Sequence, residues 1–540
     1  LNDLADPAGL PGCAAAADRL ARAVRERQPI VVYGDYDVDG VTASAILWHT
    51  LTRLGHDAVT AYVPHRLEEG YGLNPEALTK FADAAAKPLV VTVDCGITAV
   101  DAAAHAEALG LELIITDHHA LPAGALPTAA SVVHPELDGV ADPSPLCGAG
   151  VAFKLAWQTA RVCCGSDRLP AEMQRLMLDL LALAALGTVA DVVPLVGENR
   201  VITTHGLARI KDTPFDGLNA LIDAADLRAE KVDAVHVGFV LGPRLNACGR
   251  MGHAKQAVSL LTDASPVRAA ELADFLTKEN DRRRSAERAI LKQAKARVEA
   301  EGLASDGCRV IVLADEAWHP GVIGIVASRL AETYHRPAVL LGIDPATNEA
   351  KGSARSVEGL DLHAAMRECA GHCTKFGGHA MAAGLSLPPE NIEAFRTQLV
   401  ETVNARWSVA DLTPTVTYDA RVGLSECTLE LFRVLEGLAP FGRSNPRPRL
   451  MIRGAVTARP GQRMGGEGKH LTLSLRDRHG HGVRAVGFGM GDLAEELPGG
   501  VEVDAVFEPK INVWRGVSSP ELHLRAVRRS ADADDAAGGD

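Results

Sequence analysis

Tyr33-Gly-Asp-Tyr-Asp-Val-Asp-Gly40 is the stretch that organises this sequence. Three carboxylates alternate in it, at Asp35, Asp37 and Asp39, directly after an apolar run that begins at Ile30. An amphipathic run follows Gly40, so the local prediction is a strand, a tight acidic loop and a helix. Carboxylates this close repel one another unless a cation lies between them. A bound divalent metal is the favoured explanation.

Two simpler explanations compete for this stretch. Asp-x-Asp-x-Asp-Gly also opens a calcium loop of the EF-hand type. That loop needs a bidentate Glu at its twelfth position, which here is Ile46, and a helix before it instead of a strand. A solvated acidic turn is the second alternative, and the stretch alone leaves it open.

The composition predicts a multidomain protein of ordinary globular type. A chain of 540 residues is too long for one core, so we expect three or so domains. Hydrophobic residues make up 47% of the chain and charged residues 23%. The formal net charge of −14 argues against a generally basic nucleic-acid coat, but it leaves room for local basic grooves.

The cysteines and the hydropathy pattern favour a reducing cytoplasm without a membrane. Ten cysteines are scattered without a Cys-x-x-Cys pair, and no signal-peptide pattern is present. No apolar run reaches the ~18 residues of a membrane span. The chain opens at Leu1 instead of Met, which is typical of a processed or trimmed form.

From about residue 30 to 135, short apolar runs alternate with helical patterns. Continuous apolar strands separated by helices are typical of a parallel, doubly wound sheet. Ligands of such sheets bind outside the carboxyl ends of the strands. The expected strands are 30–33, 58–63, 88–93, 111–116 and 131–134.

The polar clusters of this region follow predicted strands. Asp94 ends the run 89–94, and Asp117, His118 and His119 end the run 113–119. With the acids of the first loop, they are all expected at one edge of the sheet, where one crevice can collect them. Asp191 follows an apolar helical run; alone it is a helix-end acid, and with the others it is a further candidate ligand.

These ligands favour Mg²⁺ or Mn²⁺, because hard cations prefer oxygen, and the histidine favours Mn²⁺. So many acids exceed what one ion needs, so we expect two metals roughly 3.5–4 Å apart. Two such ions clamp a phosphoryl group and stabilise the leaving oxygen. The predicted chemistry is phosphoester hydrolysis.

The middle of the chain predicts a long helix and a second α/β unit. Residues 264–301 contain no glycine and read as a mostly solvated helix that bridges two lobes. The following unit contains Gly352-Ser-Ala-Arg-Ser356 and Phe376-Gly-Gly-His379, where backbone amides and an arginine can approach a phosphate. Its histidines and cysteines match no zinc spacing, so buried thiols and satisfied histidines are favoured.

From Pro414 onward the pattern predicts a small all-β barrel. Residues 440–530 hold 15 Lys or Arg against 9 Asp or Glu, a balance of +6. A basic small barrel is a common platform for single-stranded nucleic acid, and Phe488, Phe507 and Trp514 are candidates for stacking on bases or for the core. The acidic end 531–540 is expected to be disordered. Expected elements are a helix at 428–438 and strands at 416–422, 449–457, 470–477, 483–488, 501–507 and 522–527.

Together these motifs resemble the DHH phosphoesterase superfamily. The first acidic loop, Val93-Asp-Cys-Gly96, Asp117-His118-His119 and Ala190-Asp191 follow the order of its four motifs, and the two glycine clusters resemble the DHH-associated domain. With 64–72, 242–247 and the basic barrel, the chain is similar over nearly its whole length to the RecJ family of bacterial single-strand-specific exonucleases.

The resemblance implies a role for each site residue. One metal would be held by Asp35, Asp37 and Asp94, and the other by Asp39, Asp94, His118 and Asp191, with Asp94 as the bridge. His119 would face the scissile phosphate, so that the catalytic set is Asp37, Asp39, Asp94, His118, His119 and Asp191. DNA phosphates would be bound by Arg66, Arg244, Asn246, Ser353, Arg355 and His379.

The resemblance also implies a function, namely the 5′→3′ degradation of single-stranded DNA to mononucleotides in recombination and repair. A helicase and a single-strand-binding protein would be partners of a monomeric chain. The implied domains are a DHH catalytic domain at 1–263, the connecting helix at 264–301, the DHH-associated domain at 302–405, an OB-fold domain at 412–530 and the tail.

Two alternatives stay open beside this function. One is a DHH phosphodiesterase that acts on short oligonucleotides or cyclic dinucleotides, and the basic barrel argues against it. The other is a catalytically inactive DNA-binding scaffold. The presence of every candidate ligand acid argues against that scaffold.

Overall fold

The computed structural model describes residues 3–64, 72–137, 145–251 and 254–530. It divides into two compact units, Leu1–Pro414 and Thr415–Asp540. Two expectations lie outside the described residues: Arg66 as a DNA-binding residue and 531–540 as a disordered tail.

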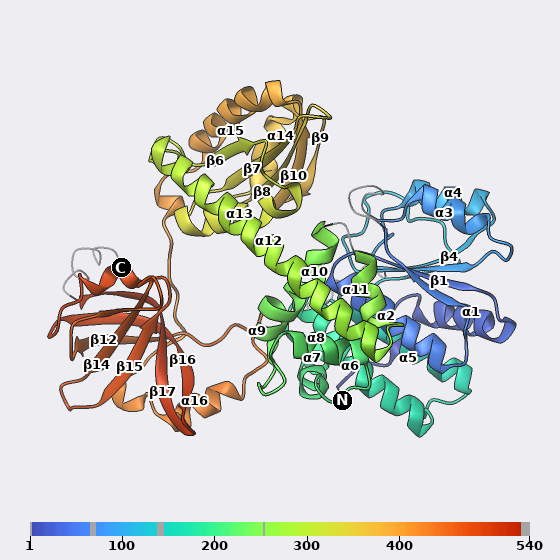
Figure 1. The fold of residues 1–540 in the computed structure, drawn as a ribbon, viewed down its shortest axis with the longest axis horizontal. Coiled ribbons are helices and arrows are strands. Elements are labelled where there is room, and N and C mark those ends of the chain that lie inside the picture. The colour runs from blue at the N-terminus through green and yellow to red at the C-terminus, as the bar shows by residue number, and fades with distance from the viewer. Residues whose placement is uncertain (1–2, 65–71, 138–144, 252–253, 531–540) are drawn as a thin grey trace. The chain divides into compact units, whose positions relative to one another are not determined.

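The first sheet of unit 1 is parallel throughout (Figure 1). Its order is β2-β1-β3-β4-β5, and each strand lies within a residue or two of a predicted apolar run. The order changes direction between β1 and β3, and such a switch point is where doubly wound sheets bind ligands. The strands are β1 (Ile30–Gly34), β2 (Val59–Tyr62), β3 (Leu89–Val93), β4 (Glu112–Thr116) and β5 (Ser131–Val133).

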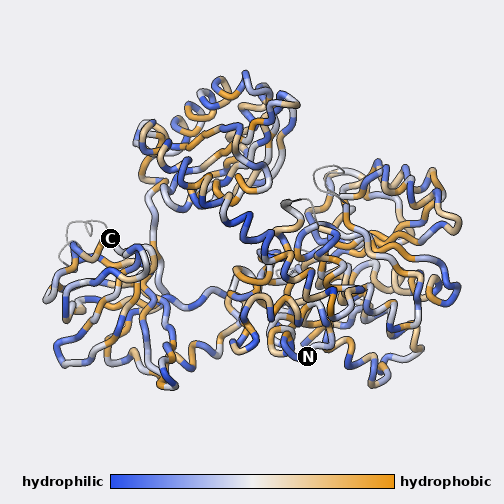
Figure 2. Tube along the Cα trace, in the orientation of Figure 1, coloured by the Kyte–Doolittle hydropathy of each residue, from blue (hydrophilic) through white to orange (hydrophobic). Residues whose placement is uncertain are grey.

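Helices cover both faces of this sheet, which confirms the predicted doubly wound α/β fold. Ile30 and Val32 of β1 pack in one core with α1 (Cys13–Glu26), α2 (Val38–Arg53) and α5 (Gly148–Cys164). Val31 and Tyr33 pack in a second core with α3 (Pro75–Ala82) and α4 (Val100–Ala108). Burial on both sides explains why the strands are apolar without alternation. Figure 2 shows hydrophobic residues along these strands.

One helix, α6 (Ala171–Ala190), is at the centre of the helical part of unit 1. It packs against α2, α5 and α7 (Gly197–Arg209). Among the described residues it alone is long and apolar enough to cross a membrane, and 72% of that window is buried inside the protein. These contacts are those of a core helix. The helices that follow are α8 (Asp216–Ala224), α9 (Ala234–His236), α10 (Gly242–Met251) and α11 (Ala254–Leu261).

The predicted long helix is α12 (Pro266–Ala300), which begins where the Ser265 side chain accepts the N–H of Arg268. It is less solvated than expected. Glu279, Asn280 and Glu287 are buried, and Glu287 forms ion pairs with Arg283 and with Arg329 of α13 (Pro320–Tyr334). The Glu287 carboxylate therefore connects α12 to the second α/β region, which is also part of unit 1.

The second α/β unit is built on a mixed sheet, in the order β6-β7-β8-β10-β9. Only β6 and β7 are parallel, and the other neighbours are antiparallel. The elements are β6 (Ile311–Asp315), β7 (Ala338–Asp344), β8 (Glu349–Arg355), α14 (Leu362–Glu368), β9 (Lys375–His379), β10 (Ala382–Leu387) and α15 (Ile392–Arg406).

Unit 2 is a closed five-stranded OB barrel, as predicted. It closes because β12 pairs with both β16 and β14, and β15 pairs in parallel with β17. Phe507 is fully buried in the barrel core beside Phe432 of α16 (Leu429–Glu436), so its stacking role is wrong. The strands are β11 (Ala420–Arg421), β12 (Leu450–Thr457), β13 (Gln462–Met464), β14 (His470–Arg476), β15 (Gly482–Gly487), β16 (Glu502–Trp514) and β17 (Val517–Arg529).

The first strand of unit 2 is shorter than predicted, and its last two strands are longer. The expected strand 416–422 is only the two-residue β11, whereas β16 and β17 have 13 residues each. They form a hairpin through Arg515 and Gly516, whose φ values of 51° and 80° suit a two-residue type I′ turn. Pro509 and Pro520 interrupt the sequence pattern of these strands, because proline is uncommon in strands.

Candidate metal centre

Four separate segments bring the predicted acids and histidines together at the carboxyl ends of β1, β3 and β4. Ligand atoms of Asp35, Asp37 and Asp94 lie within 4.8 Å of one another. Two further groups meet the same limit, and both contain His118: one is completed by Asp39 and Asp191, and the other by Asp94 and His119. The groups share members and therefore form one continuous centre.

The acidic loop is neither a solvated turn nor a calcium loop of the EF-hand type. Asp35 and Asp39 are 4% and 1% exposed, and a buried strand precedes them. Asp37 caps α2, because its Oδ1 accepts the backbone N–H groups of Asp39 (2.9 Å) and Gly40 (3.1 Å). A Cβ at Gly40 would lie 2.5 Å from the Asp35 carbonyl oxygen, so only glycine fits this tight turn.

Asp39 is bound by the N-terminus of α5. The backbone N–H of Gly148 donates to its Oδ2 (2.6 Å) and that of Ala149 to its Oδ1 (2.8 Å). The positive end of the helix dipole favours a carboxylate there. The sequence analysis missed this partner, although a helix that begins Gly148-Ala-Gly150 allows the close approach that a bound carboxylate needs.

Asp94 lies at the centre of the site in a strained conformation. Its φ of 61° is left-handed, which is uncommon for a residue other than glycine. It is 2% exposed, and a Cβ at Gly148 would lie 2.5 Å from its own Cβ. Backbone strain of this kind persists only where surrounding structure imposes it, and it concentrates at functional sites.

The electrostatics of the centre call for a cation. Burial raises the pKa of Asp94 well above its usual range, and the charges of Asp39, Asp37 and further carboxylates raise it more. Burial and the charge of Asp39 also raise the pKa of Asp37. Oxygen-rich, buried ligands with one histidine fit hard divalent cations such as Mn²⁺ or Mg²⁺.

Two atoms at the middle of the centre lack hydrogen bonds. Within the described part of the chain, neither Asp94 Oδ1 nor His118 Nε2 has a hydrogen-bond partner, although the two lie 3.1 Å apart. His118 Nε2 is also 3.6 Å from Asp191 and 3.7 Å from Asp39. Burial lowers the pKa of His118, which favours the neutral ring that a metal ligand requires.

His119 is held by Asp117 instead of by the acids of the first loop. Its Nδ1 lies 2.7 Å from Asp117 Oδ1, and this hydrogen bond, which outweighs burial, raises the pKa of His119 to about 9. Burial acts to raise the pKa of Asp117, but His119 and backbone N–H groups outweigh it and lower that pKa. Asp117 thus orients the His119 ring and favours its protonated form.

Two predicted phosphate-binding residues of α10 have partners inside unit 1. The Asn246 side chain accepts the backbone N–H of Val38 (3.0 Å), at the start of α2. The Arg244 guanidinium contacts the Val240 carbonyl (2.8 Å) and the Thr277 hydroxyl (3.3 Å), and burial lowers its pKa. Asn246 therefore fixes the acidic loop.

The other predicted phosphate-binding residues lie on β8 and β9 of the second sheet, with β10 between these two strands. Ala382 of β10 is opposite both Arg355 of β8 and His379 of β9. Arg355 donates to the Ser353 hydroxyl (3.0 Å), and burial lowers its pKa. His379 is exposed. The two glycine clusters therefore lie at the same level of the sheet, with one strand between them.

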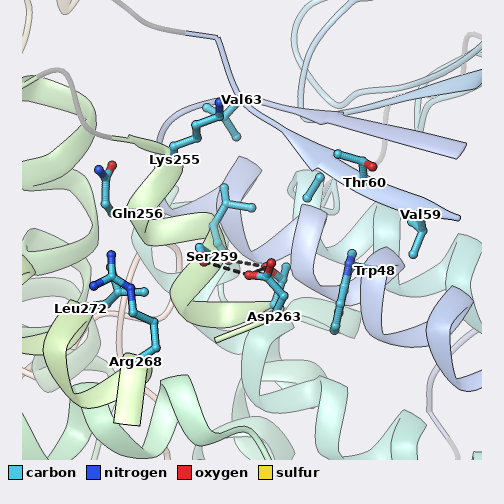
Figure 3. A pocket seen from close by; sticks show the side chains of 13 residues that line it. Trp48, Val59, Thr60, Val63, Lys255, Gln256, Ser259, Asp263, Arg268 and Leu272 are labelled. Carbon is cyan, nitrogen blue, oxygen red and sulfur yellow. Dashed lines mark hydrogen bonds between the residues drawn. The ribbon is translucent and has the colours of Figure 1, made fainter. Parts of the chain in front are cut away.

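A cavity of about 410 Å³ lies beside β2 and contains none of the candidate ligands (Figure 3). It lies among β2, α2, α11 and the beginning of α12, with Trp48, Thr60, Lys255 and Arg268 among its lining residues. Asp263 accepts the Ser259 hydroxyl at 2.8 Å there.

Comparison with known proteins matches this architecture domain by domain. Residues 29–187 match the DHH family N-terminal domain, 307–405 the DHHA1 domain and 418–526 the RecJ OB domain. The single-stranded-DNA-specific exonuclease RecJ of Thermus thermophilus is 36% identical over 532 residues, which are 96% of this chain and 71% of that protein. This chain belongs to the RecJ family.

Further similarities extend along the chain. RecJ of Bacillus subtilis is 38% identical over 524 residues, 97% of this chain, and the chain spans 64% of the length of that relative. The crystal structure of Thermus thermophilus RecJ in complex with Mn²⁺ has a TM-score of 0.81 and 34% identity. It covers 96% of this chain, and this chain covers 72% of it.

Proposed function

We propose that this chain is a single-strand-specific 5′→3′ exonuclease that hydrolyses DNA to mononucleotides with two divalent cations, Mn²⁺ in preference to Mg²⁺. The observation that carries the proposal is the set of overlapping ligand groups around Asp94. These residues would hold two divalent ions, which would supply polarisation of the phosphodiester and stabilisation of the attacking and the leaving oxygen. Strand polarity and mononucleotide release rest on family membership.

The ligand assignment is the one that the family resemblance implies, and the overlapping groups of candidate ligands support it. Asp35, Asp37 and Asp94 would hold one ion, and Asp39, Asp94, His118 and Asp191 the other, with Asp94 shared. The N-terminus of α5 fixes Asp39, and Asn246 fixes the loop, so both ligand groups are held before a substrate arrives.

His119 acts on the substrate. The contact of its Nδ1 with Asp117 orients the His119 ring, and 44% of the side chain is exposed, so a phosphate can approach it. In hydrolysis a bond forms between water and phosphorus, and the bond to the departing nucleotide breaks. A protonated His119 stabilises the negative charge that grows on the phosphate.

The remaining roles complete the proposal. DNA phosphates would be bound by Arg66, Arg244, Asn246, Ser353, Arg355 and His379. The domains would divide at 263, 301 and 405, with the OB domain at 412–530. A helicase and a single-strand-binding protein would be partners of a monomeric, cytoplasmic chain, in recombination and repair. These roles are supported by family membership and by the presence of the three matching domains.

A degradation time course tests the function. The chain with Mn²⁺ is given 5′-labelled single strands, 3′-labelled single strands and blunt duplex. Early release of labelled mononucleotide from the 5′ end, with the duplex intact, is the expected result. Cleavage of dinucleotides without cleavage of long strands would replace the proposal with a small-substrate phosphodiesterase.

A further inference from the structure

Five arginines lie on one outer face of the barrel in unit 2. Its strands are neighbours in the order β12-β16-β17-β15 (Figure 1). Val503, Ala505 and Phe507 of β16 point into the core, so Asp504, which lies between the first two, and Glu508, which follows the third, point outward. The outward set, here named the arginine face, consists of Arg449, Arg453, Arg484, Arg525 and Arg528, with the carboxylates Asp504, Glu508 and Glu521 among them.

Each carboxylate of the arginine face pairs with two basic side chains. Glu508 binds Arg525 through both oxygens (2.8 and 2.9 Å) and lies 3.8 Å from Arg449. Asp504 lies 3.8 Å from Arg453 and 3.7 Å from Arg528. Glu521 lies 3.2 Å from Arg484 and 3.1 Å from His523.

The carboxylates of the arginine face are buried, whereas its arginine side chains are exposed. The three carboxylates are between 5% and 9% exposed, whereas the five arginine side chains are between 40% and 52% exposed. The acids thus lie deeper in the face than the guanidinium groups, and Glu508 holds Arg525 through two hydrogen bonds. Each guanidinium has five N–H donors, and a carboxylate occupies only some of them. The exposed guanidinium groups keep donors that a phosphate can reach.

We infer that the arginine face binds consecutive phosphates of the DNA strand, an inference that rests on the proposed function. Five arginines against three acids leave a positive surface on a chain of net charge −14. Guanidinium forks match phosphate geometry, and the two hydrogen bonds that hold Arg525 on Glu508 lower the entropic cost of its binding. OB barrels ordinarily bind nucleic acid on their second and third strands, here β14 and β15. The arginine face lies mainly on β12, β16 and β17, and it contacts no bases.

The test is the salt dependence of DNA binding by the full chain, measured by fluorescence anisotropy without divalent metal. The double variant Arg453→Gln/Arg525→Gln leaves Asp504 and Glu508 with one arginine each. Loss of two phosphate contacts lowers the slope of log K against log salt by about 1.4, equally for oligo-dT and oligo-dA. Arg525→Lys keeps the charge and should keep the slope.

Arg433→Gln is the matched control, because Arg433 is an exposed arginine of α16 outside the arginine face. It should leave the slope unchanged. A double variant with the slope of the unsubstituted chain, or with a loss confined to one base, overturns the inference. Thermal unfolding of each variant checks the fold. Degradation with Mn²⁺ is read separately, so an inactive chain with the expected slope change would remove only the exonuclease proposal.

Discussion

At the scale of single residues, Asp94 combines burial, a left-handed backbone and membership of two ligand groups. Asparagine tolerates this backbone conformation and has nearly the same shape, but it lacks the charge. We therefore expect Asp94→Asn to fold normally, to lose at least about 100-fold in turnover and to bind Mn²⁺ more weakly. Initial rates and a Mn²⁺ titration measure this. Turnover near that of the unsubstituted chain would contradict the shared-ligand assignment.

His49 gives a residue-scale prediction for stability. Burial lowers its pKa to about 4, and its Nε2 lies 2.8 Å from the Leu261 carbonyl oxygen. Below pH 6.5 the unfolded chain binds a proton that the folded chain takes up only near pH 4. Stability is therefore present above pH 6.5 and is lost as the pH falls towards 4.

Replacement of His49 by glutamine, which keeps an N–H donor for Leu261, should remove this dependence. Between pH 7.5 and pH 5, we expect the unsubstituted chain to lose about 1–2 kcal/mol more unfolding free energy than His49→Gln. Urea unfolding at both pH values gives the difference. Equal losses in the two proteins would show that other groups cause the acid sensitivity.

At the scale of elements, three helices meet at Asp39. A Cβ at Gly187 of α6 would lie 2.4 Å from Asp39 Oδ1 and 2.5 Å from the Ala149 Cβ of α5. Replacement of a helical glycine by alanine ordinarily stabilises a helix by about 0.5–1 kcal/mol. Here the methyl group has no space, so the helices or the carboxylate must move.

We expect Gly187→Ala to destabilise unit 1 by about 1–3 kcal/mol and to lower turnover, because it displaces Asp39. Gly238→Ala is the control, since a Cβ at Gly238 meets nothing within 4 Å. Thermal unfolding and initial rates are measured for both variants. A stabilised and fully active Gly187→Ala would mean that Asp39 does not depend on this packing.

At the scale of the whole molecule, each unit has its own core. The barrel core consists of residues between Leu424 and Val527, and the other core clusters lie wholly in unit 1. We therefore expect residues 1–414 to fold without unit 2. They should hydrolyse short oligonucleotides at a rate within a few-fold of that of the full chain, but bind long strands with a smaller salt slope. Circular dichroism and the assays above test this, and an unfolded fragment would contradict the division.

The sequence by itself determined the fold class and identified the candidate ligands. Short continuous apolar runs identify the strands of the first sheet, because strands buried on both faces must be apolar throughout. The rule that ligands bind at carboxyl ends then assembles Asp35, Asp94 and His118 without coordinates. Local pattern was less informative for β16 and β17, because pairing with neighbours, not propensity, sets the length of a strand that contains proline.

Only the tertiary structure decided which groups hold the candidate ligands in place and which charged side chains lie on the same face. The contact of Asp39 with Gly148 joins residues 109 positions apart, and the contact of Val38 with Asn246 joins residues 208 apart. The arginine face likewise gathers side chains from four strands. Such contacts depend on packing between segments that are distant in the sequence. The periodicity of hydrophobic residues along the sequence carries no information about them. The local sequence pattern identified the candidate ligands, and long-range packing determined their positions.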